Sequence, residues 1–492
     1  MDGSSTEFIR TLRSRLRHYG AAPFIEFERR WYSGDTITGY LDRIRDLLDD
    51  AGVPDGAAVG VVVRNRPVDA AAILGFVTAE RSFSILYSMQ SAPALAKDVE
   101  ELRLAALVAA DEDWAPEVVE AAQRVGTVGI SAGTRSIEYV EGLDAPGEGP
   151  FGVAPEQLSI GLLTSGTTGP PKRIPITVPM LQHAAASGKA AHNPGQEALP
   201  DLLYWPLSGI GGLCPLMATV HAGRRMALLE RFTVKAWVDV VKRHRIERVG
   251  VVPATIRMVL DADVPKEDLA SLQFVFGGSA PLEPETRELF ERTYGVSIVW
   301  GYGATEFAGT IIAWTPELYR RYGQAKRESV GRPVAGVEVR VVDPETGGEV
   351  AAGQVGLLEG RVELLGPDWI RTTDLASLDE DGFVTLHGRN DGAIIRGGFK
   401  ILPERVQRAL IEHPGVRDAA VVGIPDARLG EVPFAAVEPA DGAERPDPEQ
   451  LKEWVRERLP AHHVPVRVRI VDELPRTGTL KVRRGALREL AD

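Results

Sequence analysis

Short apolar runs alternate with amphipathic segments through the first two-thirds of the chain, and this alternation constrains the fold more than any other feature. The runs Ala58–Val63, Leu104–Ala109 and Arg248–Val252 have the length and composition of buried strands, as does Phe274–Phe276. Amphipathic segments such as Val234–Arg245 precede or follow these runs. Because strands that alternate with helices build parallel sheets, the pattern predicts an α/β fold.

The pattern changes twice toward the C-terminus. From Gly331 to Leu386, residue alternation and turn signals indicate an antiparallel β unit with little helix. A compact set of helices and strands is then expected at Pro403–His413, Ala419–Gly423, Asp447–Leu459 and Val466–Val471. We therefore expect a large N-terminal domain over residues 1–388, a hinge at 389–391 and a small α+β domain over residues 392–492.

The composition argues against some classes of binding partner and indicates the cellular compartment. The net charge of −13 argues against a general nucleic-acid surface. Cys214 is the only cysteine, so no intrachain disulfide can form and a cytoplasmic setting fits. Neither a signal peptide nor a membrane span is expected, because no stretch approaches the roughly 18 uncharged apolar residues that a span requires. The histidines lack the spacing of zinc ligands, and no G-x-S-x-G sequence supports a serine hydrolase.

The strongest chemical signal is a segment rich in hydroxyl groups and glycine that follows the apolar run Ile160–Leu163. It reads Thr164, Ser165, Gly166, Thr167, Thr168, Gly169, Pro170, Pro171 and Lys172. Glycines let backbone N–H groups approach an anion, the hydroxyl groups add donors, and the lysine adds positive charge. Its spacing differs from the G-x-x-x-x-G-K-[ST] sequence of a Walker A loop, so it predicts a phosphate site of another kind.

This segment closely resembles the phosphate loop of the adenylate-forming superfamily, which includes acyl-CoA synthetases, peptide-synthetase adenylation domains and luciferases. Further segments resemble that family's motifs in its order, namely Gly277–Pro281, Gly301–Glu306, Arg371–Leu375, Gly388–Asp391, Gly397–Lys400 and Pro475–Lys481. The resemblance implies an AMP-forming acyl-CoA ligase. It also implies a large domain of two α/β layers with parallel-rich sheets and a β-barrel-like unit, followed by a small mobile C-terminal domain.

The resemblance assigns nucleotide binding to several of these segments. Tyr302 would offer a flat face on which adenine stacks. Asp374 would accept hydrogen bonds from both ribose hydroxyls, and Arg389 would reach the ribose or a phosphate from the other side. The other implied nucleotide-binding residues are Thr164, Ser165, Gly166, Thr167, Thr168, Gly169, Lys172, Gly278, Ser279 and Ala280.

The resemblance further implies a reaction in two steps, with ATP, Mg²⁺ and CoA as cofactors and acyl-AMP as the intermediate. In the first step Thr305 would bind the α-phosphate and Glu306 would hold Mg²⁺, for which a carboxylate is a suitable ligand. Lys481 would bridge the attacking carboxylate and the phosphate. The small domain would then rotate at Asp391 and bring a loop to the pantetheine channel, lined by Gly397 and Gly398.

The segment that follows Pro206 and Leu207 departs from the family's pattern. Many family members carry an aromatic–His pair there, whereas this chain has Ser208 and Gly209. Small residues leave room for a substrate, so we assign an acyl pocket to Ser208, Gly209, Gly211 and Gly277 and expect a bulky carboxylic acid.

Two other departures concern the first step. Thr373 and Leu480 stand where the family's ribose and lysine segments carry glycine. These changes leave open a variant that only converts supplied acyl-AMP into acyl-CoA. A second alternative is a stand-alone adenylating enzyme that loads a separate carrier protein, because no carrier domain follows the lysine segment. The sequence identifies neither the acid nor the oligomeric state.

Overall fold

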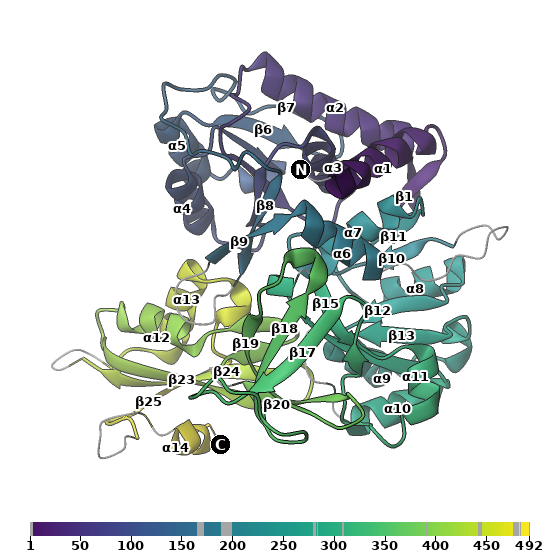
Figure 1. The fold of residues 1–492 in the computed structure, drawn as a ribbon. Helices are drawn as coiled ribbons and strands as arrows, with labels where there is room; N and C mark the ends of the chain where they lie inside the picture. The colour runs from purple at the N-terminus through teal and green to yellow at the C-terminus, as the bar shows by residue number, and fades with distance from the viewer. Residues whose placement is uncertain are drawn as a thin grey trace.

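The computed structural model describes residues 3–164, 172–187, 199–278, 282, 284–307, 309–389, 392–440, 445–475, 482 and 484–491. Within these residues the strands form five sheets. In Figure 1 the N-terminal elements lie at the top, the middle elements at the lower right and the C-terminal elements at the lower left. No helix of the described residues has the length and apolarity needed to cross a bilayer.

The first sheet has seven strands, most of them parallel. In sheet order these are β7 (Ile137–Tyr139), β6 (Val128–Ala132), β5 (Ala106–Ala109), β3 (Val59–Val63), β4 (Phe83–Tyr87), β8 (Ser159–Thr164) and β9 (Lys172–Thr177). Only the edge strands β7 and β9 are antiparallel to their neighbours. The strands predicted at Ala58–Val63 and Leu104–Ala109 are confirmed as β3 and β5.

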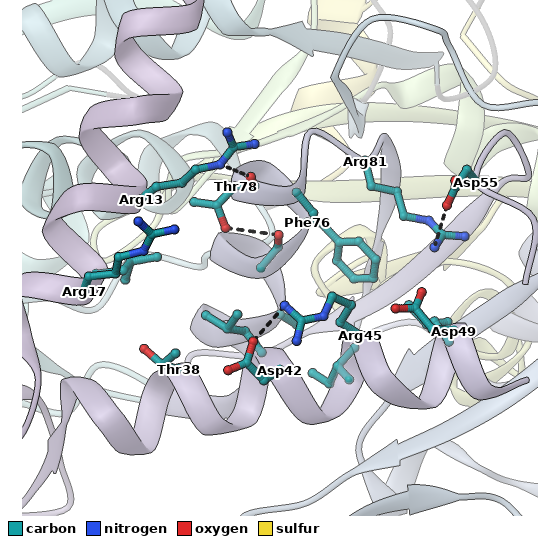
Figure 2. Close-up of a pocket in the computed structure, with 17 residues that line it drawn as sticks. Arg13, Arg17, Thr38, Asp42, Arg45, Asp49, Asp55, Phe76, Thr78 and Arg81 are labelled. Carbon is teal, nitrogen blue, oxygen red and sulfur yellow. Dashed lines mark hydrogen bonds and ion pairs between the residues drawn. The ribbon is translucent and has the colours of Figure 1, made fainter.

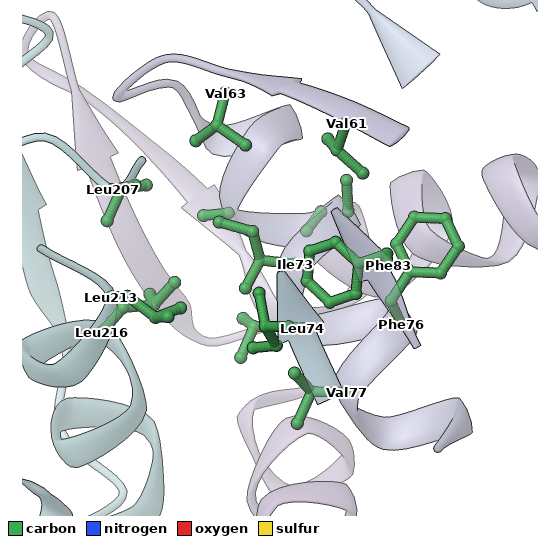
Figure 3. Close-up of a cluster of buried hydrophobic side chains, with 14 of the residues drawn as sticks. Val61, Val63, Ile73, Leu74, Phe76, Val77, Phe83, Leu207, Leu213 and Leu216 are labelled. Carbon is green, nitrogen blue, oxygen red and sulfur yellow. The ribbon is translucent and has the colours of Figure 1, made fainter. Parts of the chain in front are cut away.

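Helices cover both faces of this sheet, as parallel sheets require. Val61 and Val63 of β3 belong to one apolar core, and Val62 points into another. The helices beside the sheet are α1 (Gly3–Tyr19), α2 (Gly34–Asp50), α3 (Pro67–Ala79), α4 (Ala92–Leu102) and α5 (Pro116–Val125). Figure 3 shows Ile73 and Leu74 of α3 facing Leu213 and Leu216 of a later helix. That later helix is α7 (Ile210–His221), so residues from the middle of the chain contribute to the apolar core of the first sheet.

The second sheet carries the candidate adenine residue Tyr302 and the end of the strand that leads to Gly278. Its strands are β12 (Arg248–Val251), β13 (Phe274–Gly277), β14 (Ser297–Ala304), β15 (Gly309–Ala313) and β16 (Arg332–Pro333), of which the first three are parallel. The flanking helices are α8 (Val234–His244), α9 (Pro253–Asp261), α10 (Pro284–Tyr294) and α11 (Pro316–Tyr322). The strands predicted at Arg248–Val252 and Phe274–Phe276 are therefore confirmed, as is the helix that follows Thr233.

The antiparallel β unit predicted over residues 331–386 is a four-stranded meander. Its strands are β17 (Val337–Val342), β18 (Gly356–Val362), β19 (Ile370–Leu378) and β20 (Val384–Arg389). Val337, Leu358 and Val384 pack into the same apolar core as the second sheet. Figure 1 shows this unit in front of the middle elements.

A smaller sheet joins the start of the chain to its middle. Its strands in order are β10 (Asp201–Leu203), β11 (Met226–Leu228), β1 (Pro23–Phe27) and β2 (Arg30–Ser33). Glu26 is buried there and pairs with His244 and with Arg243, whose Nη2 lies 2.6 Å away. The sequence pattern did not indicate this sheet. Other short elements are α6 (Val178–Ser187), η1 (Asp111–Asp113), η2 (Lys266–Leu269) and η4 (Glu363–Leu365).

The C-terminal elements have apolar cores of their own. Their strands are β22 (Phe399–Ile401), β21 (Ile394–Arg396), β24 (Gly430–Pro439) and β23 (Val416–Asp426), with β25 (Arg467–Ile470) paired to β24. Their helices are α12 (Pro403–Ile411), α13 (Pro448–Arg458), η5 (Ala461–His463) and α14 (Arg484–Glu489). Asp447 caps α13 by accepting a hydrogen bond from the Gln450 N–H. The hinge at 389–391 stays a prediction, because Asn390 and Asp391 lie outside the described residues.

Candidate functional site

The predicted phosphate loop connects two antiparallel strands of the first sheet. Thr164, the last residue of β8, pairs with Lys172, the first residue of β9. Because β8 is parallel to β4, the loop leaves the sheet at the carboxyl end of a parallel strand, where α/β sheets commonly bind ligands. The loop residues Ser165, Gly166, Thr167, Thr168 and Gly169 lie outside the described residues, as do the side chains of Thr164 and Lys172.

The ends of β13 and β14 approach each other too closely for side chains. A Cβ atom at Gly278 would lie 2.9 Å from the carbonyl oxygen of Gly301. In the neighbouring β14–β15 hairpin, one at Gly303 would lie 2.0 Å from the carbonyl oxygen of Gly309. Glycine is therefore required at position 278, beside β14, and at position 303, beside β15. Ser279 and Ala280, which follow Gly278, lie outside the described residues.

Two predicted catalytic residues follow β14 in a short helical turn, η3 (Thr305–Phe307). Phe307 is fully buried and anchors the turn in the core of the second sheet. Glu306 is exposed and Thr305 is half-buried, so the carboxylate faces solvent at the end of β14. No group of three or more His, Cys, Asp or Glu side chains in the described part of the chain could hold a metal ion. An exposed single carboxylate fits Mg²⁺ that takes its other ligands from phosphate and water.

The predicted adenine and ribose residues are in direct contact. The Tyr302 hydroxyl donates a hydrogen bond of 2.6 Å to Oδ2 of Asp374, although the residues are 72 positions apart. The Asp374 N–H donates to Oγ1 of Thr372, whose hydroxyl donates to the Leu358 carbonyl at 2.8 Å. Asp374 is also the register partner of Arg389 across β19 and β20. The side chain of Arg389 is not among those described.

The predicted channel loop is the tight turn between β21 and β22. Gly397 and Gly398 have φ values of +57° and +90°, which glycine adopts without strain. On one side of the turn, Nη1 of Arg396 donates to the carbonyl of His462 at 2.8 Å. On the other side, the Phe399 ring stacks on the His462 ring with a centroid distance of 4.6 Å. Lys481 and the hinge residue Asp391 are outside the described residues.

Tryptophan side chains occupy part of the volume expected to be open in the acyl pocket. A Cβ atom at Gly211 would lie 2.5 Å from Cε3 of Trp205, and one at Gly277 would lie 2.3 Å from Cζ3 of Trp300. At Gly209 the nearest atom would be 3.6 Å away. Ser208 is buried. The glycines at 211 and 277 therefore make room for indole rings, and the acyl pocket stays a prediction.

Two buried titratable side chains lie near these elements. His183 of α6 is buried next to Thr310 of β15, and burial lowers the pKa of its imidazole, so the ring is neutral at pH 7. Cys214 of α7 is buried, and this burial raises the pKa of its thiol to about 12. A thiol in this environment behaves as a small buried apolar side chain. No local motif distinguishes His183 from the other histidines.

A separate cavity of about 450 Å³ lies among α1, α2 and α3. Figure 2 shows Phe76 and several arginine side chains among the residues that line it, including Arg13, whose Nε donates to the Thr78 carbonyl at 2.6 Å. Arg45 pairs there with Asp42 at 2.9 Å. None of the predicted site residues lines this cavity, so it is distinct from the candidate site.

Comparison with known proteins gives matches along almost the whole chain. The family model for AMP-binding enzymes matches residues 12–362, and the model for their C-terminal domain matches residues 405–481. The 4-coumarate–CoA ligase-like protein 9 of Oryza sativa subsp. japonica is 31% identical over 494 residues, which cover 94% of this chain and 88% of that protein. Feruloyl-CoA synthase of Amycolatopsis sp. is 28% identical over 498 residues, which cover 96% of this chain and 95% of that one.

A solved structure extends the similarity to the fold. Amide bond synthetase McbA from Marinactinospora thermotolerans superposes with a TM-score of 0.84 at 28% identity, covering 98% of this chain and 99% of that one. The predicted α/β class, with parallel-rich sheets in a large first part and a small second part, is thereby confirmed.

Proposed function

The chain belongs to the family of AMP-binding enzymes, and on that premise we propose that it joins a carboxylic acid to CoA through an acyl-adenylate. Membership of the adenylate-forming superfamily makes it an acid-activating enzyme of the acid–thiol ligase class. The observation that best supports a working nucleotide site is the Tyr302–Asp374 hydrogen bond. It brings the adenine motif and the ribose motif together from two different sheets.

In the proposed first step, a carboxylate oxygen attacks the α-phosphorus of ATP, and the bond to pyrophosphate breaks. Attacker and target are both negatively charged, so the reaction depends on positioning and on cationic or hydrogen-bonding groups. Thr305, which follows β14 in η3, would donate to an α-phosphate oxygen. Lys481 supplies the positive charge between carboxylate and phosphate. Mg²⁺, held by Glu306, would neutralise phosphate charge when bound.

In the proposed second step, the sulfur of CoA attacks the acyl carbonyl carbon, the carbon–oxygen bond to AMP breaks, and the thiol gives up its proton. The turn at Gly397 and Gly398 would line the path of the pantetheine arm. Both glycines have positive φ, and the turn carries no side chain that would narrow that path. CoA is the acceptor that we favour, because the two sequence relatives described above are named for CoA ligation; McbA, whose structure matches as fully, is named for amide bond synthesis, and an amine is the competing acceptor.

The acid is proposed to be aromatic and of the size of a hydroxycinnamate. The support comes from the aromatic surroundings of the predicted acyl pocket, where Trp205 and Trp300 fill the volume beside two glycines. The relatives whose names mention coumarate and ferulate are consistent with this class.

A product screen tests this function. The protein is incubated with ATP, Mg²⁺ and a library of acids, and mass spectrometry detects acyl-AMP, then acyl-CoA after CoA is added. Parallel reactions replace CoA with a pantetheinylated carrier protein or a primary amine, and a reaction without ATP is the control. Acyl-CoA from an aromatic acid is expected. Thioester on the carrier alone, or amide alone, would replace CoA as the acceptor, and the absence of any acyl-AMP or acyl product would contradict the proposal.

A further inference from the structure

A buried asparagine ties the first sheet to the segment before α7. Asn65 follows β3 and is only 3% exposed. Its Nδ2 donates to the carbonyls of Trp205 at 3.0 Å and Leu229 at 3.1 Å. Its Oδ1 accepts from the Leu207 N–H at 2.8 Å. Both N–H groups and the oxygen of the amide thus have partners, and because leaving a buried polar group unpaired is costly, the backbone around Trp205 is strongly held.

The backbone on either side of this contact is fixed by further packing. Leu207 is fully buried in the core of the first sheet, and Figure 3 shows it beside Leu213 of α7 and near Val63 of β3. Tyr204, which directly precedes Trp205, is also buried, and its hydroxyl donates a hydrogen bond to the Gly250 carbonyl at 2.8 Å. The backbone of Trp205 is therefore held in place by the residues on both sides of it, Tyr204 and Leu207.

The indole ring of Trp205 lies between two glycines on different elements. A Cβ atom at Gly211 of α7 would be 2.5 Å from its Cε3, and one at Gly250 of β12 would be 3.7 Å from its Cζ2. Phe276 of β13 lies next to Gly250 and is 47% exposed, which is unusual for so large an apolar side chain. Trp205 and Phe276 thus border the same region of the second sheet.

This region joins the two segments assigned to the acyl pocket. Gly209 and Gly211 come from the start of α7, and Phe276 immediately precedes Gly277 at the end of β13. A ring at position 205 therefore sets how much space remains between these segments. An acyl group with a flat face can lie against the indole, whereas a thicker or longer group would need the volume that the ring occupies.

We propose that Trp205 determines the size and shape of the acyl group that this protein accepts, and that Asn65 is the positioning residue that holds Trp205 in place. The inference rests on the proposed acid-activating function. The selected class is flat carboxylic acids with a single aromatic ring, and acids with two linked rings are excluded by the indole.

The test compares a one-ring acid, 4-hydroxycinnamate, with a two-ring acid, biphenyl-4-carboxylate. For each protein we take the ratio of the two kcat/KM values in acid-dependent ATP–pyrophosphate exchange, because a ratio does not depend on the fraction of active protein. Trp205→Ala should shift this ratio toward the larger acid by about tenfold or more, the scale of pocket-size effects. Trp205→Phe should give a smaller shift, and it keeps the test valid if the alanine variant does not fold.

Asn65→Ala should shift the ratio in the same direction, because it releases Trp205. The double variant Asn65→Ala/Trp205→Ala should match Trp205→Ala alone, since Asn65 then has no ring to position. Ser82→Ala is the matched control. Ser82 is also buried at the same sheet and makes three hydrogen bonds with backbone groups of Pro155, Gln157 and Ser159, so its loss should lower stability without moving the ratio.

Equilibrium binding of the same two acids separates this inference from the proposed function. A Trp205→Ala ratio equal to wild type, in exchange and in binding, would overturn the role of Trp205. A wild-type ratio in Asn65→Ala would overturn the positioning role of Asn65. If wild type shows no exchange with any acid while Trp205→Ala still shifts the binding ratio, the adenylation proposal fails and Trp205 keeps its role.

Discussion

The hydroxyl of Tyr302 gives this residue a second role beside the adenine stacking that its ring would provide. It binds the Asp374 carboxylate at 2.6 Å, and Asp374 is the proposed ribose ligand. Tyr302→Phe keeps the ring and removes the hydroxyl. We expect a KM for ATP raised roughly tenfold, within the range for hydrogen bonds to charged groups, and weaker discrimination against 2′-deoxy-ATP. Exchange kinetics with both nucleotides check this, and an unchanged ATP to 2′-deoxy-ATP ratio would show that the hydroxyl does not orient Asp374.

Single residues could be proposed from the sequence where a motif contains them, and not where only tertiary packing distinguishes them. Tyr302, Asp374 and Glu306 could be selected because each sits in a segment with a recognisable pattern of residue types. Asn65 could not, since one asparagine after a strand has no chemical signature and its partners lie 140 to 164 positions away. The glycine at 211 suggested open space, but its true neighbour is the ring of Trp205, which no local pattern reveals.

At the scale of elements, the turn η5 places the buried His463 and the partly buried His462 against the β21–β22 hairpin. Burial lowers the pKa of His462 from 6.5 to about 4 and that of His463 to about 2. The unfolded chain therefore binds protons that the folded chain rejects, so stability is full above pH 6.5 and falls as pH drops toward 4. The lowered pKa of His462 alone corresponds to a loss of about 3 kcal/mol in the free energy of unfolding once the pH is below its folded-state value.

Thermal unfolding of the wild type and of His462→Gln between pH 7 and pH 4 tests this coupling. The glutamine side chain does not titrate, so the variant should lose less stability than wild type over this pH range. Arg456→Gln, which changes an exposed side chain of the neighbouring helix α13, is a control that should follow the wild-type curve. If the stability of wild type and that of His462→Gln fall equally with pH, then His462 has the same pKa in the folded and in the unfolded chain.

Helices and strands were predictable where the hydrophobic pattern of a single segment determines them. The helix expected at Asp447–Leu459 is observed as Pro448–Arg458, with Asp447 as its cap. The strand expected at Ala419–Gly423 extends over Val416–Asp426, because its long antiparallel partner β24 adds hydrogen bonds at both ends. The sheet formed by β10, β11, β1 and β2 was missed, since Ile25 pairs with Met226, far along the chain.

At the scale of the whole molecule, the order of the motifs predicted the fold, but the contact between large and small parts was not predictable. The Ser91 hydroxyl, at the start of α4, donates to the Glu457 carbonyl near the end of α13 at 2.8 Å. This hydrogen bond is one of the contacts between α4 and α13, and its small size is compatible with the proposed domain rotation.

The proposed hinge gives a prediction at this scale. Asp391→Pro fixes φ and should restrict the rotation between the two steps. We expect acyl transfer from supplied acyl-AMP to CoA to slow severalfold more than ATP–pyrophosphate exchange does. Single-turnover measurements of the two half-reactions check this, and equal effects on both would remove Asp391 as the hinge.

The central claim is that this protein forms an acyl-adenylate from ATP with its own lysine. Acid-dependent ATP–pyrophosphate exchange by the wild type and by Lys481→Ala, with transfer from supplied acyl-AMP measured in parallel, tests it most directly. We predict exchange in the wild type that Lys481→Ala abolishes, with transfer to CoA retained in both proteins. Transfer without exchange in the wild type, or equal exchange in the variant, would contradict the account.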